Sequence, residues 1–172
     1  MIVSAHDGYP RWVDSGADFV ELDIRRDHRH RIVLAHDEPR RWKRYVTFDE
    51  LLRRLDTRVG LHLDLKETGF ELELVHKALA RWPPEKIVVT PDRETSAEAI
   101  KATFGGVRVS PIDFVTLDQR YATAEVLARA TKPVWVWTVD DRREMERLMA
   151  AGIECLITNR PDLALEVRSA RP

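Results

Sequence analysis

Short β-type runs that alternate with helical patterns predict an α/β fold built on a mainly parallel sheet. The number of these runs along the 172 residues favours a closed (βα)8 barrel of the TIM type over an open sheet. Because barrels of this kind usually need about 200 residues or more, we expect a compact version with shortened or missing helices.

Each element is predicted from its own pattern. The predicted strands cover residues 2–6, 19–24, 31–36, 60–66, 86–90, 107–110, 113–117, 134–138 and 153–158. The predicted helices cover residues 49–56, 71–82, 96–104, 122–130 and 142–152. Asp140 or Asp141 can cap the last of these helices, and Gly152 ends it. The segments 7–18 and 110–113 are too short for a complete helical connection, so the helix layer should be thin there.

One connection cannot be a parallel crossover. Only about four residues join the second and third predicted strands, whereas a parallel crossover needs a dozen or more. The segment 19–36 is therefore predicted to be an antiparallel hairpin. Centring its turn pairs Ile24 with Val33 and Glu21 with His36, which would make the last two near neighbours.

Composition predicts a soluble protein without a strongly charged partner. The chain is 44% hydrophobic and 33% charged, with a formal net charge of −1, so no overall field draws it to nucleic acid or to an anionic membrane. We expect a cytoplasmic protein without stable membrane insertion, because no leader and no apolar run of membrane-spanning length is present. The single cysteine, Cys155, is predicted to be a buried thiol. Paired arginines, predicted to be solvated surface, occur at 25–26, 40–41, 53–54 and 142–143.

Titratable side chains gather at the ends of the first predicted strands. They are His6, Glu21, Asp23, His36, Asp64 and Lys66. Charged groups are costly on apolar strands unless a partner or a metal satisfies them, and barrel enzymes carry their catalytic residues at strand ends on one rim. Three carboxylates, two imidazoles and one ammonium are the set that metal-assisted phosphoryl chemistry needs.

The carboxylates are candidate metal ligands. Glu21 and Asp23 are two residues apart and share one strand face, and Asp64 can supply a third oxygen. Crowded carboxylates raise each other's pKa unless a cation neutralises them, and hard oxygen ligands suit Mg²⁺ or Ca²⁺. The alternative is that the short Glu-x-Asp pattern marks ordinary outward residues of an edge strand.

The basic groups are candidates for proton transfer and phosphate binding. His6 and His36 fit a general acid–base pair because imidazole titrates near neutral pH, although a histidine at a strand end can also be structural. His62 shares the face of Asp64 and stays a candidate for the site. Lys66, on the same face, would contact a phosphate oxygen or pair with a neighbouring carboxylate.

Two tryptophans alternate with valines in VWVWTV. One of them is expected to face the barrel interior and the other the helices. Trp137, nearer the end of the strand, is the candidate for lining a substrate pocket. Trp135 is the candidate for core packing.

Taken in order, these segments resemble the glycerophosphodiester phosphodiesterase family. The matching stretches are SAHDG (4–8), GADFVELDI (16–24), RIVLAHDEP (31–39), LHLDLK (61–66), VWVWTVDD (134–141) and LITNRPDLAL (156–165). The resemblance implies one barrel domain over residues 1–172 that hydrolyses a phosphodiester to an alcohol and a phosphomonoester such as glycerol 3-phosphate. It implies these roles: metal ligands Glu21, Asp23 and Asp64, acid–base pair His6 and His36, and phosphate contact Lys66.

The chain departs from the family pattern at two positions. Asp7 stands where the family has an arginine, which removes a phosphate-binding cation, and Asp64 stands where it has a glutamate. The stretches DLKETG (64–69) and TNRPD (158–162) instead resemble the sphingomyelinase D branch of the phospholipase D proteins, which share the barrel and form a cyclic phosphate.

Three hypotheses follow from the sequence. The first is a metal-dependent phosphodiesterase acting on a small-molecule or lysolipid diester, and the second is a lyase that stops at a cyclic phosphate. The third is a barrel that binds a phosphorylated ligand without turnover. The thin helix layer also predicts a homodimer.

Overall fold

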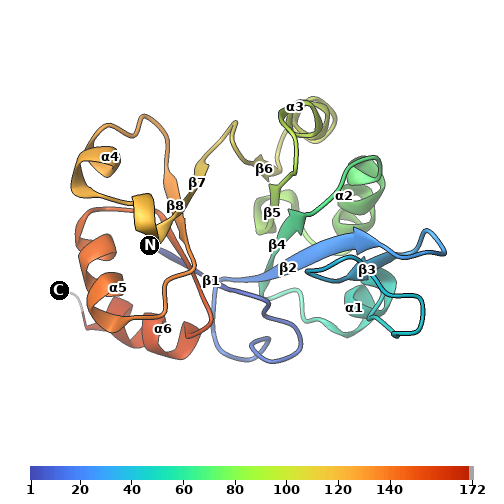
Figure 1. The fold of residues 1–172 in the computed structure, drawn as a ribbon, viewed down its shortest axis with the longest axis horizontal. Coiled ribbons are helices and arrows are strands. Elements are labelled where there is room, and N and C mark those ends of the chain that lie inside the picture. The colour runs from blue at the N-terminus through green and yellow to red at the C-terminus, as the bar shows by residue number, and fades with distance from the viewer. Residues whose placement is uncertain (171–172) are drawn as a thin grey trace.

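Strands and helices alternate along residues 1–170, which are the residues that the computed structural model describes (Figure 1). The strands are β1 (Ile2–Ala5), β2 (Phe19–Arg26), β3 (Ile32–Leu34), β4 (Gly60–Leu65), β5 (Ile87–Thr90), β6 (Arg108–Val109), β7 (Val115–Asp118), β8 (Val134–Trp137) and β9 (Cys155–Thr158). The helices are α1 (Phe48–Arg54), α2 (Glu71–Leu79), α3 (Glu94–Thr103), α4 (Ala124–Ala128), α5 (Arg142–Ala150) and α6 (Pro161–Ser169). Short 3₁₀ turns occur at Pro84–Lys86 and Gln119–Tyr121.

One sheet contains all of these strands. Its order is β6-β5-β4-β2-β1-β9-β8-β7, with β3 added beside β2, and every pairing except β2–β3 is parallel. Figure 1 shows the sheet curled, with α1, α2 and α3 beside one part and α4, α5 and α6 beside the other. The expected TIM-type α/β architecture is confirmed, including the segments without helices at 7–18 and 110–113. The expected full closure of the barrel is wrong, because the sheet is curled but its two end strands do not pair within residues 1–170.

The curled sheet ends at β6 and β7, which are not paired with each other in the described chain. Side chains bridge the interior beside this opening. Arg108 on β6 forms an ion pair with Glu154 at 2.7 Å, and Nε1 of Trp135 donates to the same carboxylate at 2.7 Å. The guanidinium of Arg108 also lies 5.4 Å from the ring centroid of Phe114. The two-residue length of β6 leaves few backbone groups for a ladder, so packing and charge contacts replace hydrogen-bonded closure.

The hairpin predicted at 19–36 is confirmed, but its register differs by one residue. Ile24 pairs with Leu34, and Arg25 with Val33. The backbone N–H of Ala35 then donates to the carbonyl of Asp23 at 2.9 Å. The predicted pairing of Glu21 with His36 is therefore wrong, because turn chemistry, not a count from the centre, determines the register.

Local signals explain where the helices begin and end. Thr47 and Glu50 form a capping box at α1, and Asp141 caps α5 through the N–H of Glu144. Gly152, with φ of +79°, follows α5 and ends it as predicted. Helix α6 was not among the predicted helices, although Pro161 at its first turn is a favourable start.

Alternate residues of the strands separate two apolar regions. The outward residues pack against the helices in the larger core, whose largest buried side chain is Trp82. The inward residues form a smaller cluster inside the curled sheet: Val88, Phe114, Trp135, Cys155 and Ile157, with Ile2 and Phe19 against it. Gly60 permits this inner packing, because a Cβ there would lie 2.4 Å from the Phe19 ring.

The two tryptophans of β8 lie on the same side of the sheet. Trp135 is fully buried in the inner cluster, whereas Trp137 is 43% exposed and lines a pocket above it. The prediction that one of them faces the helices is wrong, because residues two apart on a strand share a face. Their separate roles in packing and pocket lining agree with the expectation. Cys155 is buried as expected. Within residues 1–170, no helix has the length and apolar character to span a bilayer.

Candidate active site

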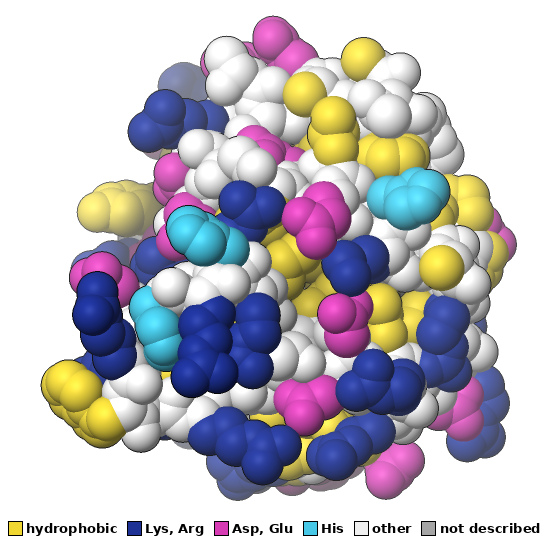
Figure 2. Space-filling view, turned by 90° about the vertical axis from the view of Figure 1, so that its right-hand side faces the viewer, with side chains coloured by type: hydrophobic (Ala, Val, Ile, Leu, Met, Phe, Trp, Pro, Cys, Tyr) yellow, Lys and Arg dark blue, Asp and Glu magenta, His cyan; other side chains and the backbone are white. Residues whose placement is uncertain are grey.

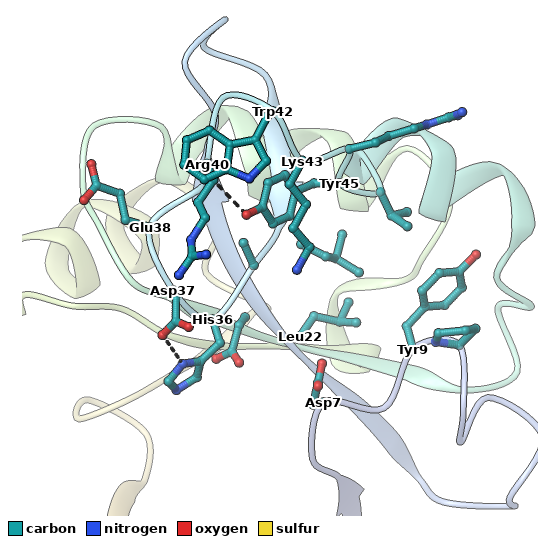
Figure 3. A pocket seen from close by; sticks show the side chains of 16 residues that line it. Asp7, Tyr9, Leu22, His36, Asp37, Glu38, Arg40, Trp42, Lys43 and Tyr45 are labelled. Atoms are coloured by element: carbon teal, nitrogen blue, oxygen red, sulfur yellow. Dashed lines mark hydrogen bonds and ion pairs between the residues drawn. The ribbon is translucent and has the colours of Figure 1, made fainter.

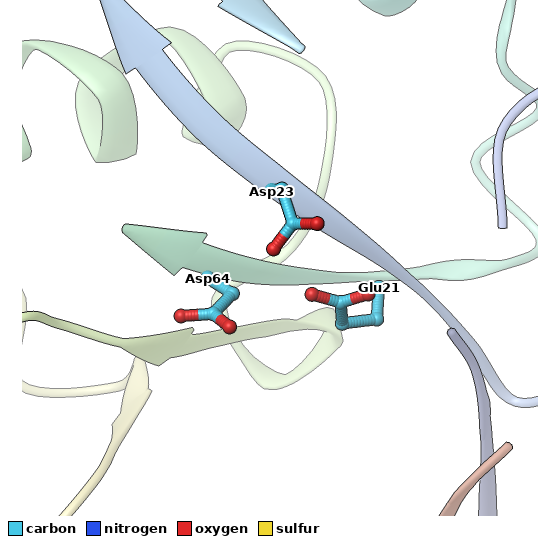
Figure 4. Close-up of side chains that lie close together, drawn as sticks. All are labelled: Glu21, Asp23 and Asp64. Carbon is cyan, nitrogen blue, oxygen red and sulfur yellow. The ribbon is translucent and has the colours of Figure 1, made fainter. Parts of the chain in front are cut away.

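Three carboxylates meet where β2 and β4 approach their carboxyl ends (Figure 4). Glu21 and Asp23 extend from the same face of β2, and Asp64 is the parallel partner of Asp23 on β4. One oxygen from each lies within 4.8 Å of the others. Glu21 and Asp23 are buried and Asp64 is half-buried. The predicted convergence of these side chains is thus present in the fold, and it places three negative charges in a poorly solvated position.

A single ammonium lies against this cluster. Nζ of Lys66 is 2.7 Å from Oδ1 of Asp23 and 2.7 Å from Oδ2 of Asp64. Burial lowers the pKa of Lys66, but the two carboxylates more than offset this and raise it, so the group stays charged. Salt bridging was one of the two roles expected of Lys66. Its one positive charge leaves two of the three negative charges without compensation.

Burial and mutual repulsion both disfavour the charged forms of the carboxyl groups in this cluster. Burial, with repulsion from Asp23 next, raises the pKa of Glu21 well above its ordinary value of 4.5. Burial also raises the pKa of Asp64, against the lowering effect of Lys66. Oε1 of Glu21 is buried with no hydrogen-bond partner among residues 1–170. A divalent cation would fit this donor set, since it supplies the missing charge and a partner for the orphaned oxygen.

His6 is oriented by a chain of hydrogen bonds that sequence reasoning missed. Its Nδ1 lies 2.9 Å from Oδ1 of Asn159. The amide nitrogen of Asn159 donates to Oδ2 of Asp140 at 2.8 Å, and the backbone N–H of Asn159 donates to Oδ1 at 2.8 Å. The amide oxygen is therefore the acceptor, so the network assigns the proton of neutral His6 to Nδ1 and leaves Nε2 free to accept one.

Asn159 and Asp140, which form this network, lie in TNRPD (158–162) and VWVWTVDD (134–141), and neither was predicted to be a site residue. The order of the sheet, with β9 between β1 and β8, explains their meeting. Thr158 also donates to Asp140 through its hydroxyl at 2.9 Å. A polar residue within three positions of the end of each of two neighbouring strands was the available signal, but the strand order was needed to use it.

His36 lies at the mouth of the site and not within it. Its side chain is 70% exposed, and Nδ1 is 3.1 Å from Oδ1 of Asp37. It follows β3, which ends at Leu34, two residues earlier than the predicted strand. Even so, His36 lines the same pocket as His6 and Glu21. The carboxylate of Asp37 accepts from Nδ1, which leaves Nε2 of the imidazole available to a ligand.

His62 lies deeper in the barrel, on the face it was expected to share with Asp64. Nδ1 is 3.2 Å from the hydroxyl of Ser4, and Nε2 is 3.0 Å from the hydroxyl of Thr90. The ring stands edge-on to Trp135, with centroids 5.1 Å apart. Burial, together with the positive charge of Lys66, lowers the pKa of His62 to about 3. It is therefore neutral near pH 7 and forms a polar floor beneath the acidic cluster.

A pocket of about 390 Å³ connects these groups. Its lining includes His6, Glu21, His36, His62, Asp64, Lys66 and Trp137, which brings most of the predicted site residues together. Asp23 lines a second hollow of about 840 Å³, and His36 lines both (Figure 3). The pocket and the larger hollow therefore share His36, and the larger hollow is lined by the loop that precedes α1.

Asp7 contributes its backbone to the cluster. Its N–H donates to Oε2 of Glu21 at 2.8 Å, and its φ of +43° is in the left-handed region. The side chain of Asp7 is exposed and lines the larger hollow. A carboxylate therefore stands on the approach to the site, where the resemblance had implied a cation.

The fold and site define an α/β barrel with an acidic, histidine-containing centre at one rim. The model of the glycerophosphoryl diester phosphodiesterase family matches residues 72–163. The chain belongs to this family, whose enzymes are phosphoric diester hydrolases acting on glycerophosphodiesters. The matched segment begins after Lys66, so the roles of the strand-end residues rest on their geometry. A comparison with curated proteins finds no match.

Solved structures share the fold along almost the whole chain. A phosphodiesterase from Oleispira antarctica, in complex with the product sn-glycerol-3-phosphate, has a TM-score of 0.79 at 15% identity, covering 99% of this chain and 97% of that chain. Glycerophosphodiester phosphodiesterases from Thermotoga maritima and Agrobacterium tumefaciens have TM-scores of 0.74 and 0.73 at 16% and 15% identity. The Thermotoga maritima match covers 98% of this chain and 98% of that chain. The Agrobacterium tumefaciens match covers 99% of this chain and 100% of that chain.

Proposed function

We propose that this barrel hydrolyses glycerophosphodiesters at the rim formed by β1, β2 and β4, with Glu21, Asp23 and Asp64 holding Mg²⁺ or Ca²⁺. The observation that carries the proposal is the group of three carboxylates within 4.8 Å of one another beside the His6 pocket. The uncompensated charge and the orphaned oxygen of Glu21 support a cation there. The larger hollow beside the site leaves room for the alcohol part of the diester.

Each polar group then has a distinct task. A bound cation would polarise the phosphoryl oxygens and lower the cost of negative charge developing on them. Lys66 has one ammonium group for three carboxylates and a phosphate, so a cation in the cluster would free it to contact the phosphate. Trp137 offers an apolar wall to the glycerol or alcohol chain.

The two histidines divide the proton transfers. His6 is the base, because its Nδ1–H is committed to Asn159 and Nε2 can take a proton from the attacking water as the water oxygen bonds to phosphorus. His36, held by Asp37 at the mouth, is the acid that gives a proton to the leaving alcohol oxygen as its bond to phosphorus breaks. One proton is removed and one is delivered, so the pair ends the cycle by exchanging protons with water.

The experiment measures products from glycerophosphocholine and lysophosphatidylcholine with Mg²⁺, with Ca²⁺ and with EDTA. Wild type is compared with His6→Ala and, as matched control, with His76→Ala, which removes an exposed histidine of α2. We expect metal-dependent turnover that His6→Ala lowers by about 10²–10⁴-fold and that His76→Ala leaves unchanged. Turnover that persists in EDTA, or an active His6→Ala enzyme, would disprove the mechanism.

Phosphorus NMR of the same reactions separates hydrolysis from cyclisation. An open glycerol phosphate supports the hydrolase, whereas an accumulating cyclic phosphate assigns the chain to the lyase alternative. A rise in melting temperature with Mg²⁺ but no turnover of either diester would instead leave a barrel that only binds.

We also propose that residues 1–172 act as one domain and that the native state is a homodimer. The helix layer is missing at 7–18 and 110–113, and β7, next to the second of these segments, is half-buried along its whole length, which a second copy could cover. Light scattering at micromolar concentration tests this, and a single 19.9 kDa species would refute the dimer.

A further inference from the structure

The most exposed large apolar side chain of residues 1–170 is Trp42, in the loop between β3 and α1. Its surface is 83% accessible, whereas Trp82 and Trp135 are 1% and 0% accessible. Tryptophan is costly to leave in water, and its amphipathic ring favours the headgroup region of a bilayer. With so much of its surface in solvent, the indole can contribute little to packing of the folded protein.

The residues on both sides of Trp42 are cations. Residues 40–44 have the sequence RRWKR and are all exposed; we call them the basic loop. Within the basic loop, Arg44 forms an ion pair with Glu50 at 3.2 Å, whereas Arg40, Arg41 and Lys43 have no ion-pair partner among residues 1–170. Figure 2 shows many Lys and Arg side chains, with Asp and Glu side chains among them, on the face of the molecule that carries the β2–β3 hairpin. The chain as a whole has a net charge of −1, so this positive patch is local.

The ends of the basic loop hold it in a defined place. The N–H of Leu34 donates to the carbonyl of Val46 at 2.9 Å, which ties the segment after the loop to the end of β3. The hydroxyl of Tyr45 accepts from the backbone N–H of Arg40 at 3.0 Å (Figure 3). The half-buried Tyr45 ring also lies 5.0 Å from Nζ of Lys43. These contacts hold the loop with Trp42 and its cations facing outward. The loop should therefore lose little conformational entropy when it binds a partner.

The loop also borders the proposed site. Arg40, Trp42 and Lys43 line the hollow of about 840 Å³ together with His36 and Asp23. His36 lines the catalytic pocket as well. A surface bound by the loop would therefore lie next to the entrance of the site.

We propose that the basic loop docks the protein onto anionic phospholipid bilayers, with Trp42 in the headgroup layer and Arg40, Arg41 and Lys43 on lipid phosphates. One exposed indole among cations is the combination that favours interfacial binding, because apolar insertion and charge attraction act together. A single-stranded nucleic acid, the other polyanion to consider, is usually bound along a groove with several stacking aromatics, and the loop has one. The link to catalysis rests on the proposed function; the docking itself does not.

The test is co-sedimentation of the full chain with vesicles of phosphatidylcholine alone and of phosphatidylcholine with an equal part of phosphatidylglycerol. Binding needs no turnover, so its outcome is independent of the proposed reaction. We expect binding to the mixed vesicles, weak binding to the neutral ones, and loss of binding at high salt. Absence of binding to the mixed vesicles at low salt would overturn the proposal.

Variants assign the binding to the loop. Trp42→Ala should weaken the partition coefficient by about tenfold, and the double change Arg40→Ala with Arg41→Ala by about 25-fold, at about fivefold a charge. Tyr121→Ala, which removes another exposed aromatic side chain, and Arg53→Ala with Arg54→Ala, on the last turn of α1, are matched controls. Equal losses in the controls would refute the loop's role. Loss of vesicle binding to an equimolar single-stranded oligonucleotide would overturn the bilayer as the partner of the loop.

Discussion

The interior of the curled sheet has two layers that differ in chemistry although the same strands supply both. On β2, Phe19 belongs to the apolar layer, and Glu21, two residues later, belongs to the acidic cluster. On β8, Trp135 is completely buried, and Trp137 lines the pocket. Two residues along a strand therefore separate an apolar layer that favours folding from a polar layer whose buried charge disfavours it. Because the two layers are separate, the site can hold unfavourable electrostatic interactions without weakening the sheet beneath it.

The largest effect we expect comes from breaking the apolar layer. Trp135→Ala should lower the free energy of unfolding by about 3–5 kcal/mol, because the ring packs at 4.6 Å from Phe114 and 5.1 Å from His62, measured between centroids. Urea denaturation measures this loss. Trp137→Ala is the matched control on the same strand face, and it should cost less than about 1 kcal/mol. Equal losses would show that the two layers do not differ in their contribution to stability.

The next effect concerns the positioning of His6 in the polar layer. Asn159→Ala should lower kcat by about 10–100-fold, because Nδ1 of His6 loses the acceptor that holds its proton and its orientation. Asn159→Asp places a carboxylate there instead, and a negative charge favours the imidazolium form. The acid limb of the kcat/KM profile should then move to higher pH. A purely structural role for Asn159 would lower activity in both variants and leave that limb in place.

A smaller effect should have opposite signs for stability and activity. Glu21→Gln keeps the acceptor for the Asp7 N–H but removes a buried charge, so the metal-free variant should gain on the order of 1 kcal/mol at neutral pH while losing metal-dependent turnover. The pKa of Glu21 is higher in the folded protein than in the unfolded chain. As the pH rises, the unfolded chain therefore loses this proton at a lower pH than the folded protein does. The metal-free wild type should therefore lose stability as the pH rises from about 4.5 through the folded-state pKa of Glu21.

Thermal melts over this pH range, with EDTA and with Mg²⁺, measure the effect. Mg²⁺ should flatten the wild-type slope and leave Glu21→Gln unaffected, since the cation replaces the missing positive charge. A wild-type slope that equals that of Glu21→Gln would show that Glu21 titrates normally and carries no strain.

Sequence patterns alone were sufficient for the strands and for the acidic cluster. Period-two alternation placed Glu21 and Asp23 on one face, and the short link at 27–30 required a hairpin. These patterns could not predict features that depend on which segments lie side by side in the fold. The hairpin register depends on turn conformation, and the contact of Asn159 with His6 depends on β9 lying beside β1. The exposure of Trp42 likewise depends on where the loop leaves the core, which no pattern within RRWKR encodes.

The smallest effect tests the entrance to the polar layer. Asp7 is exposed and lines the larger hollow, where an approaching diester meets its negative charge. Asp7→Asn removes that charge, and asparagine tolerates the φ of +43° that lets the backbone N–H reach Glu21. Because the carboxylate is solvated, the repulsion amounts to only a few tenths of a kcal/mol, and KM for glycerophosphocholine should fall about twofold with kcat unchanged. A higher KM in Asp7→Asn would mean that the carboxylate attracts the substrate, as it would if it contacted the cationic choline group.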